Sequence, residues 1–365
     1  MRRGMRTGLF GFPRISRPLL AAAAMIAAFA VAGASRPLAA AAADAPALQP
    51  AKIRQNLFGA CFPSIETGWV AGDLGRVYKT TDGGALWQPQ TVGGRLPFLS
   101  VACSDPQHAW LSSTHGRIFS TADGGTTWKE TQTPSEETLL QARFASSTRG
   151  TAVGDRGTVL HTENGGAVWN LVDLPEGFTI PESGVEQGID PHDVVLYSVA
   201  YVGTEVAYVA GEFGTLLRSD DGGQSFRQLS GGLESTLFGI GALDDKIAVA
   251  VGIDGIVLRT EDGGATWKVL PTPFPDRAYY DVALSGNIGW IVGVRGTILT
   301  TEDRGATWKE FPTPIEYAAE WYRAISLVGN GGYLVGGGGL IYKVDGVTAQ
   351  LLGHETNTAA EGASK

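Results

Sequence analysis

The sequence predicts an all-β fold, a β-propeller of seven four-stranded blades, and three observations predict it. A short motif recurs at a constant interval, a second motif with two glycines precedes it, and together they divide the chain into units of about 41 residues. The 365 residues also include 51 glycines and nine tryptophans, while charged residues make up only 18%. Glycine is thus about twice as frequent as usual. A fixed period of this length indicates one supersecondary unit used many times.

The first motif has the form Ser/Thr-x-Asp-x-Gly-x-x-Trp and is the Asp-box, also called the bacterial neuraminidase repeat. Its six clear copies close on Trp87, Trp128, Trp169, Phe226, Trp267 and Trp308. The intervals between these residues are 41, 41, 57, 41 and 41, so the long interval holds a 16-residue insertion, at about 176–193. A degraded seventh copy at 345–349 keeps Gly346 and Thr348 but lacks the aromatic residue.

The second motif is an apolar, β-branched run, a turn with two glycines, and another apolar run. It stands at 69–75, 153–157, 210–214, 251–255 and 292–296, and in altered form at 113–116 and 335–339. This pattern is typical of a β-hairpin. In the sixth unit it predicts strands at 281–284, 289–292, 297–301 and 307–311. Four short strands per unit are typical of a propeller blade.

The length of the repeat region predicts the number of blades. Residues 53–352 number 300, and 284 remain without the insertion, close to the 287 of seven units. Seven blades are therefore predicted, with six as the alternative. The seventh unit has the pattern of all four strands, so closure of the ring by an N-terminal strand is not required. Residues 44–52 are expected to be a linker and 353–365 a disordered tail.

Residues 1–43 have the order of a secretory signal peptide. They contain six arginines and no acidic residue, an alanine-rich apolar run from about 18 to 33, and then small residues. Basic, apolar and small residues in this order favour export, with an uncleaved anchor as the alternative. The predicted location is the periplasm, or a thylakoid lumen or the exterior.

Composition excludes several classes of function. Without residues 1–43 the chain has 22 basic and 37 acidic residues, a balance of −15, so no nucleic-acid partner is expected. The five histidines are dispersed and show no metal-ligand spacing, so we expect neither a metal nor a cofactor. No nucleophile elbow or phosphate-binding loop is present. The chain is expected to be a monomer.

The Asp-box residues are predicted to be structural. The Asp or Asn accepts backbone N–H groups in a tight turn, and the aromatic residue buries a large ring between sheets. The residues assigned this role are Asp82, Trp87, Asp123, Trp128, Asn164, Trp169, Asp221, Phe226, Asp262, Trp267, Asp303 and Trp308. Three more tryptophans, Trp69, Trp110 and Trp290, share one position in the second strand. Only Trp321 lies outside both sets.

One face of the predicted propeller is the candidate binding surface. Turns between second and third strands share this face with the blade-to-blade loops and with the insertion, and loops on a rigid scaffold commonly carry function. Arginine and aromatic residues suit recognition of a protein partner. The candidates are Arg143, Arg156, Arg277, Tyr279, Tyr280, Arg295, Trp321, Tyr322 and Arg323. An ordinary solvated face is the alternative.

The two cysteines, Cys61 and Cys103, occupy nearly equivalent first-strand positions in adjacent units. First strands of neighbouring blades converge on the central axis. A disulfide between them is therefore one expectation, and two buried thiols are the other.

The repeat unit, seen at 68–87 and 289–308, resembles the photosystem II stability/assembly factor family. This resemblance covers essentially all of residues 53–350. It implies a seven-bladed propeller behind a signal peptide. It also implies a lumenal chaperone that binds the newly made D1 reaction-centre subunit through an Arg-bearing face in photosynthetic organisms.

The sequence therefore favours a non-enzymatic, exported scaffold or assembly chaperone that binds a membrane or exported protein. An accessory protein of a membrane transporter is one alternative. The other is a sialidase-like glycoside hydrolase, in which Arg143, Arg277 and Arg323 would bind substrate and Tyr280 would be the nucleophile. The Phe-Arg-Ile-Pro segment expected of a sialidase is missing, and no carboxylate pair stands out in the first strands.

Overall fold

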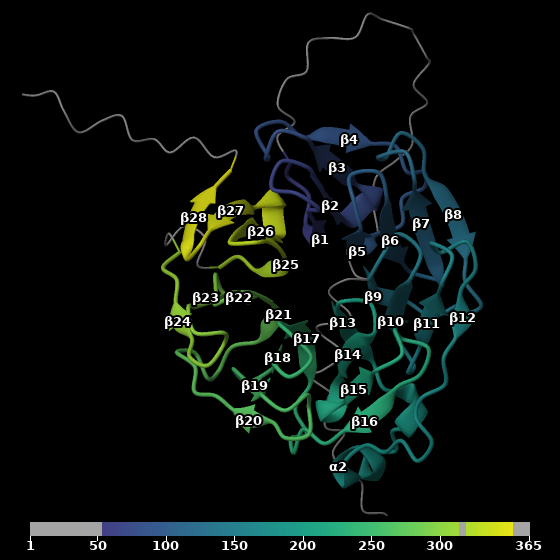
Figure 1. The fold of residues 1–365 in the computed structure, drawn as a ribbon, viewed down its shortest axis with the longest axis vertical. Coiled ribbons are helices and arrows are strands. Elements are labelled where there is room, and N and C mark those ends of the chain that lie inside the picture. The colour runs from purple at the N-terminus through teal and green to yellow at the C-terminus, as the bar shows by residue number, and fades with distance from the viewer. Residues whose placement is uncertain (1–52, 314–318, 353–365) are drawn as a thin grey trace, which may run out of the picture. The chain divides into compact units, whose positions relative to one another are not determined.

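A computed structural model describes residues 53–313 and 319–352, which form a seven-bladed β-propeller (Figure 1). Each of the seven sheets has four strands in chain order, and neighbouring strands are antiparallel. The prediction of seven blades is confirmed. The predicted signal peptide, linker and tail lie outside the described residues. No helix among the described residues is long and apolar enough to cross a membrane.

The strands fall into four sets by their place in the blade. The first strands are β1 (Leu57–Cys61), β5 (Phe98–Cys103), β9 (Leu139–Phe144), β13 (Leu196–Val202), β17 (Leu237–Ala242), β21 (Tyr279–Ser285) and β25 (Tyr322–Val328). The second are β2 (Gly68–Gly72), β6 (Ala109–Ser113), β10 (Gly150–Gly154), β14 (Val206–Gly211), β18 (Ala248–Gly252), β22 (Ile288–Gly293) and β26 (Gly331–Gly336). The third are β3 (Val77–Thr80), β7 (Arg117–Thr121), β11 (Val159–Thr162), β15 (Leu216–Ser219), β19 (Val257–Thr260), β23 (Ile298–Thr301) and β27 (Ile341–Asp345). The outermost are β4 (Gln88–Gln90), β8 (Lys129–Gln132), β12 (Asn170–Leu171), β16 (Arg227–Leu229), β20 (Lys268–Val269), β24 (Lys309–Glu310) and β28 (Thr348–Leu351).

The first strands contact one another in a closed ring around the central axis, and β25 of blade seven meets β1 of blade one. All four strands of blade seven come from the end of the repeat region, so no strand is exchanged between the ends. The ring closes by packing instead. Phe62 stacks on Tyr333 with centroids 3.6 Å apart, and the Phe62 N–H donates to Ser326 Oγ at 2.9 Å. The apolar core lies between neighbouring blades, as this junction shows.

The insertion follows β12 and contains the short helix α2 (Glu182–Glu186) and the turn η2 (Pro191–Asp193). Its Phe178 and Ile180 are buried in the apolar core between blades three and four. The Thr179 backbone N–H and carbonyl bond the side chain of Gln228 in β16, at 3.1 and 2.7 Å. The insertion therefore packs on blade four and covers part of its outer edge strand.

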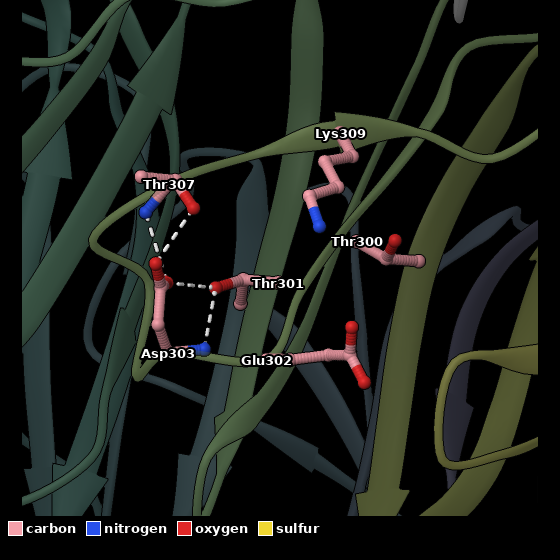
Figure 2. A pocket seen from close by; sticks show the side chains of 6 residues that line it. All are labelled: Thr300, Thr301, Glu302, Asp303, Thr307 and Lys309. Atoms are coloured by element: carbon pink, nitrogen blue, oxygen red, sulfur yellow. Dashed lines mark hydrogen bonds between the residues drawn. The ribbon is translucent and has the colours of Figure 1, made fainter.

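The Asp-box turn is built from local hydrogen bonds, as blade six shows (Figure 2). Thr301 Oγ1 accepts from the N–H of Gly305 at 3.1 Å and donates to Asp303 Oδ1 at 2.6 Å. Asp303 also accepts from the N–H and the hydroxyl of Thr307, at 2.9 and 2.6 Å. A hollow beside the turn is lined by Thr300, Thr301, Glu302, Asp303, Thr307 and Lys309. The Asp303 carboxylate is thus already bonded within the turn.

The boxes differ in the residue directly before the closing aromatic, which is apolar in blade one (Leu86) and blade three (Val168). In four boxes a Thr or Ser hydroxyl there donates to the second carboxylate oxygen: Thr127, Ser225, Thr266 and Thr307. Asn164 has Val168 at this place, and only the Val168 N–H bonds its Oδ1. The pKa values of Asp123, Asp221, Asp262 and Asp303 all fall to about 2.

The seventh copy is a shortened version of the same turn. Gly346 donates its N–H to the carbonyl of Asn330 at 2.8 Å, as Gly83 does to Glu66 at 2.8 Å in blade one. Asp345 pairs directly with Thr348 across a two-residue hairpin. The turn is therefore too short to hold the remaining Asp-box bonds.

Each Asp-box turn is also joined to the preceding blade. The acceptor is the carbonyl of the residue after the Asp or Asn, or of Gly346 in blade seven. The donor comes from a cross-strand pair in the second and third strands of the preceding blade. The bonds are Lys79 to Gly124 (2.7 Å), Trp110 to Gly165 (2.8 Å), Arg218 to Gly263 (3.0 Å), Arg259 to Arg304 (3.2 Å), Trp290 to Gly346 (3.2 Å) and Lys343 to Gly83 (3.3 Å).

The junction between blades three and four uses a relay. Thr151 of blade three bonds the hydroxyl of Tyr201 at 2.7 Å, and that hydroxyl donates to the Gly222 carbonyl at 2.9 Å. At each of the seven junctions, therefore, the equivalent carbonyl accepts a hydrogen bond from a side chain. This role accounts for Trp110 and Trp290, whereas at the position of Trp69 the donor is its cross-strand partner Lys79.

The structure contains a disulfide between Cys61 and Cys103, with Cα atoms 5.8 Å apart. It joins the ends of the first strands β1 and β5. Of the two expectations for these residues, the structure therefore has the bonded one.

Trp110 and Trp69 offer a matched test of the junction bond. Both rings are fully buried, but among the described residues the Trp69 Nε1 has no hydrogen-bond partner because Lys79 supplies the donor. We expect Trp110→Phe to destabilise the fold by about 1–2 kcal/mol more than Trp69→Phe, because it leaves the Gly165 carbonyl without its partner. Denaturant unfolding measures the difference. Equal losses would show that the bond contributes nothing.

The low pKa values of the Asp-box carboxylates predict loss of stability in acid. For Asp262, the hydroxyl and N–H of Thr266 lower the pKa to about 2, below the value of about 3.9 in an unfolded chain. The stabilisation is therefore complete above about pH 4 and is lost as the pH falls towards 2. The double variant Asp262→Asn/Thr266→Val, which copies the box of blade three, should show a smaller fall in melting temperature over this range. An equal fall in the melting temperatures of the double variant and the wild type would contradict this role of Asp262.

Candidate functional site

The turns between second and third strands and the blade-to-blade loops lie on one face, which we call the loop face. In blade three, the Asp155 N–H donates to the Thr138 carbonyl before β9, at 3.0 Å. The Gly157 N–H donates to the Val194 carbonyl before the next blade, at 2.6 Å. The same pair of bonds recurs in blades four, five and six. Each turn is thus held between the loops that enter its own blade and the next one.

The middle residue of every one of these turns has a left-handed backbone. The seven residues, which we call the turn tips, are Leu74, His115, Arg156, Phe213, Asp254, Arg295 and Gly338, with φ from 53° to 62°. Glycine adopts this conformation most readily, and other residues adopt it at a cost of about 1 kcal/mol. Six of the seven tips nevertheless carry side chains. Strained residues of this kind often mark functional surfaces.

A second ring of residues lies at the start of the first strands. Each of these strands has one residue that breaks the pairing register with the second strand. These seven bulge residues are Phe58, Leu99, Leu140, Tyr197, Phe238, Tyr280 and Arg323. They lie where the first strands begin, next to the loop face and around the central axis. Six of the seven are aromatic or aliphatic.

The bulge residues of blades four to seven form a continuous aromatic and cationic surface. The rings of Tyr197 and Phe238 are 5.0 Å apart, and those of Phe238 and Tyr280 are 5.7 Å apart, both edge-on. The Arg323 guanidinium lies 5.5 Å from the centre of the Tyr280 ring and donates to the Tyr280 carbonyl at 3.3 Å. Tyr197, Tyr280 and Arg323 are partly exposed. Such pairing of a cation with aromatic rings is favourable.

Arg143 joins this surface from across the axis. It lies in β9 of blade three, and its Nη1 reaches only the carbonyls of Val101 and Ala142, at 3.5 and 3.4 Å. Asp281 lies in blade six and is buried, and both its oxygens accept backbone N–H groups, from Val282 and Ile325. Burial raises the pKa of Asp281, and the charge of Arg143 opposes that shift. Blades three and six are not neighbours, so the charge of Arg143 acts on Asp281 from across the axis.

Of the other predicted arginines on the loop face, Arg277 and Arg295 are in contact, and Arg156 lies apart from them on blade three. Arg277 stacks on Phe274, with its Cζ 3.7 Å from the ring centre, and donates to the Arg295 carbonyl at 3.3 Å. The Arg295 side chain itself points to Asp276, at 3.6 Å. Arg156, on blade three, pairs with Glu137 at 3.6 Å and with Asp193 of the insertion at 3.0 Å.

The tyrosines Tyr279 and Tyr322 are not surface residues, and here the prediction is corrected. Both are fully buried, and the Tyr279 hydroxyl donates to the Phe274 carbonyl. Each comes directly before its bulge residue, so its side chain points into the sheet packing. Trp321 is partly exposed and stacks on Phe58, with centroids 5.8 Å apart. Phe58, Tyr197, Phe238 and Asp281 were missed. Successive bulge residues are 41 to 43 positions apart except across the insertion, where the interval is 57.

The chemistry of this surface fits binding better than hydrolysis. A Tyr nucleophile needs an ionised or easily ionised hydroxyl, whereas burial raises the pKa of Tyr280, and only Arg323 opposes this shift. Asp281, the carboxyl beside it, is occupied by backbone donors. Among residues 53–313 and 319–352, no group of three His, Cys, Asp or Glu side chains could hold a metal ion.

The chain is similar to known proteins of one family of assembly factors. The family model described as "Photosynthesis system II assembly factor YCF48" matches residues 95–181 and 131–273, which cover blades two to five. A search of curated proteins found no match.

Solved structures share the fold. One is titled "YCF48 bound to D1 peptide", with a TM-score of 0.64, 17% identity, and coverage of 80% of this chain and 94% of that one. YCF48 from Cyanidioschyzon merolae has a TM-score of 0.64 and 21% identity, covering 81% and 97%. The GH74 xyloglucanase from Xanthomonas campestris has a TM-score of 0.63 and 14% identity, covering 81% of this chain and 53% of the enzyme. Likeness at these identities shows the fold alone.

The strain at the turn tips predicts that two substitutions change the free energy of unfolding in opposite directions. Arg295→Gly should stabilise the fold by about 1 kcal/mol, because glycine adopts a positive φ without strain and the exposed ion pair with Asp276 contributes little. Gly338→Ala should destabilise it by a similar amount, although an added Cβ would meet no atom within 4 Å. Urea unfolding of the two variants measures both effects. Two changes of the same sign would contradict the assignment of strain.

Proposed function

Since the chain is a photosystem II assembly factor-like propeller, we propose that it is a non-enzymatic, exported scaffold that binds a segment of a membrane or exported protein. The observation that carries this proposal is the surface of Tyr197, Phe238, Tyr280 and Arg323 beside the axis. Aromatic and guanidinium groups held on a rigid scaffold are typical of the centres of protein-binding surfaces.

The chemistry of the surface defines the kind of segment it binds. The aromatic rings suit apolar side chains, and Arg323 suits a carboxylate or a backbone carbonyl. A D1 peptide, the ligand named for one similar structure, is the first candidate. In a photosynthetic organism the partner would be this reaction-centre subunit. Elsewhere it would be another membrane or exported protein.

Export is part of the proposal and is supported by two observations. Residues 1–43 have the pattern of a signal peptide. The disulfide between Cys61 and Cys103 is of the kind that persists in oxidising compartments such as the periplasm.

The test is binding of a fluorescently labelled D1 peptide to the full chain, measured by anisotropy. The double variant Tyr280→Ala/Arg323→Ala should weaken binding about tenfold or more, because it removes a cation and an aromatic ring from the centre of the surface. Arg117→Ala is the matched control, since Arg117 is partly exposed and pairs with Glu130 on the outer strands of blade two. Equal affinities of the double variant and the wild type would reject this surface.

A second arm tests the enzymatic alternative that the GH74 likeness raises. The full chain is incubated with xyloglucan and with aryl glycosides, and product release is measured. We expect none. Cleavage that is lost in Tyr280→Phe would overturn the proposal in favour of a hydrolase.

A further inference from the structure

Blade one carries a group of exposed residues on the loop face that peptide binding near the axis does not use. Arg54, Arg76 and Arg95 are all exposed, and within the described part of the chain none of them forms an ion pair. Leu74 stands among them with 58% of its surface exposed. We call Arg54, Leu74, Arg76 and Arg95 the blade-one patch.

The fold brings these residues together from three segments of the chain. The turn η1 (Asp73–Gly75) is bound to the segment before β1, because the Asp73 N–H donates to the Asn56 carbonyl at 3.1 Å. Its other side packs on the loop that leaves blade one. There an added Cβ on Gly75 would lie 3.3 Å from the Cα of Arg95. Arg76 thus directly follows the turn that presents Leu74, and Arg95 lies on the far side of that turn. Arg54 stands two residues before Asn56, with its backbone against Gly339 of the blade-seven turn.

Neither packing nor backbone conformation explains a leucine at this tip. Its φ is 54°, where glycine is favoured and a branched apolar residue is strained. The only other apolar tip, Phe213, packs on Gly184 and Ile180 of the insertion. The remaining side chains at tips are polar or charged. Leu74 is therefore the one tip among the seven that holds a large apolar side chain out to solvent.

The local charge is opposite to that of the chain as a whole. The chain after residue 43 has a balance of −15, whereas the patch has three arginines. The nearest carboxylate in the turn, Asp73, is partly buried, and burial raises its pKa. Glu320 of the last blade-to-blade loop lies near Gly337 at the neighbouring turn. The patch is thus a positive region with an apolar tip.

We propose that the blade-one patch docks on an anionic lipid bilayer, with the arginines on the headgroups and Leu74 inserted between them. Basic residues beside an anionic membrane and an apolar side chain at the headgroup boundary both favour attachment. The rest of the acidic domain would be repelled, so docking fixes one orientation, with the loop face towards the membrane. This inference goes beyond peptide binding and uses none of its residues.

The test places a fluorophore at the tip. Because the two native cysteines are joined, Leu74→Cys in the full chain can be labelled alone with an environment-sensitive dye such as NBD. Vesicles of equal parts phosphatidylglycerol and phosphatidylcholine should shift its emission to the blue and increase its intensity. Pure phosphatidylcholine vesicles should not, and added salt should weaken the response. The matched control is Asp254→Cys, the same tip in blade five, which should not respond.

The charge requirement is tested in the labelled protein. Replacing Arg54, Arg76 and Arg95 by Gln should lower the apparent affinity for the anionic vesicles at least tenfold, while binding of the D1 peptide stays unchanged. No response at residue 74, or an equal response at residue 254, would overturn the proposal. An equal response to soluble polyglutamate would also overturn it, because it would identify the patch as a site for acidic protein segments. Failure of peptide binding alone would leave this result unaffected.

Discussion

The ring depends on one repeated interaction, the hydrogen bond from each blade to the carbonyl that follows the Asp or Asn of the next Asp-box turn. A carbonyl buried at a blade junction needs a partner, and a seven-fold ring presents this requirement seven times. The partners differ: lysine, tryptophan, arginine and a Thr–Tyr relay all supply it. Each junction therefore requires a hydrogen-bond donor at one position, whereas the type of residue that supplies this donor varies. The last of these bonds, from Lys343 to Gly83, crosses the junction between blades seven and one, where Phe62 also stacks on Tyr333.

The two faces of the propeller consequently have different roles. On the Asp-box face, carboxylates, hydroxyls and carbonyls are consumed by turn and junction bonds, as the hollow beside Asp303 shows. On the loop face, strained tips carry side chains and guanidinium groups such as Arg323 lack a carboxylate partner among the described residues. The polar groups of the Asp-box turns are thus used within the fold, whereas the loop face presents side chains that are available for recognition.

Much of the fold could be predicted from the sequence because it rests on local chemistry. The Asp-box turn depends on residues within eight positions, so its period gives the blade count and places the strands. The site was harder to predict because it depends on register. Tyr279 and Tyr280 are neighbours, yet the bulge sends one into the core and leaves the other at the surface. Since a shift of one residue exchanges the faces of a strand, no pattern of residue types alone could separate them. The electrostatic effect of Arg143 on Asp281 was equally hidden, because it arises only when blades three and six face each other across the ring.

The insertion reduces the number of candidate binding residues on the loop face. Sixteen extra residues on the loop face suggested a functional loop, but Phe178 and Ile180 are buried against blade four and Thr179 bonds its outer strand. It also covers Phe213, the tip that would otherwise be the second exposed apolar one. Among the described residues, the exposed apolar side chains left on the loop face are then those around the axis, Leu74 in blade one and Val185 of the insertion. The axial side chains and Leu74 lie on the same face, so a membrane bound at Leu74 would bring the axial surface close to the bilayer from which a membrane-protein segment emerges.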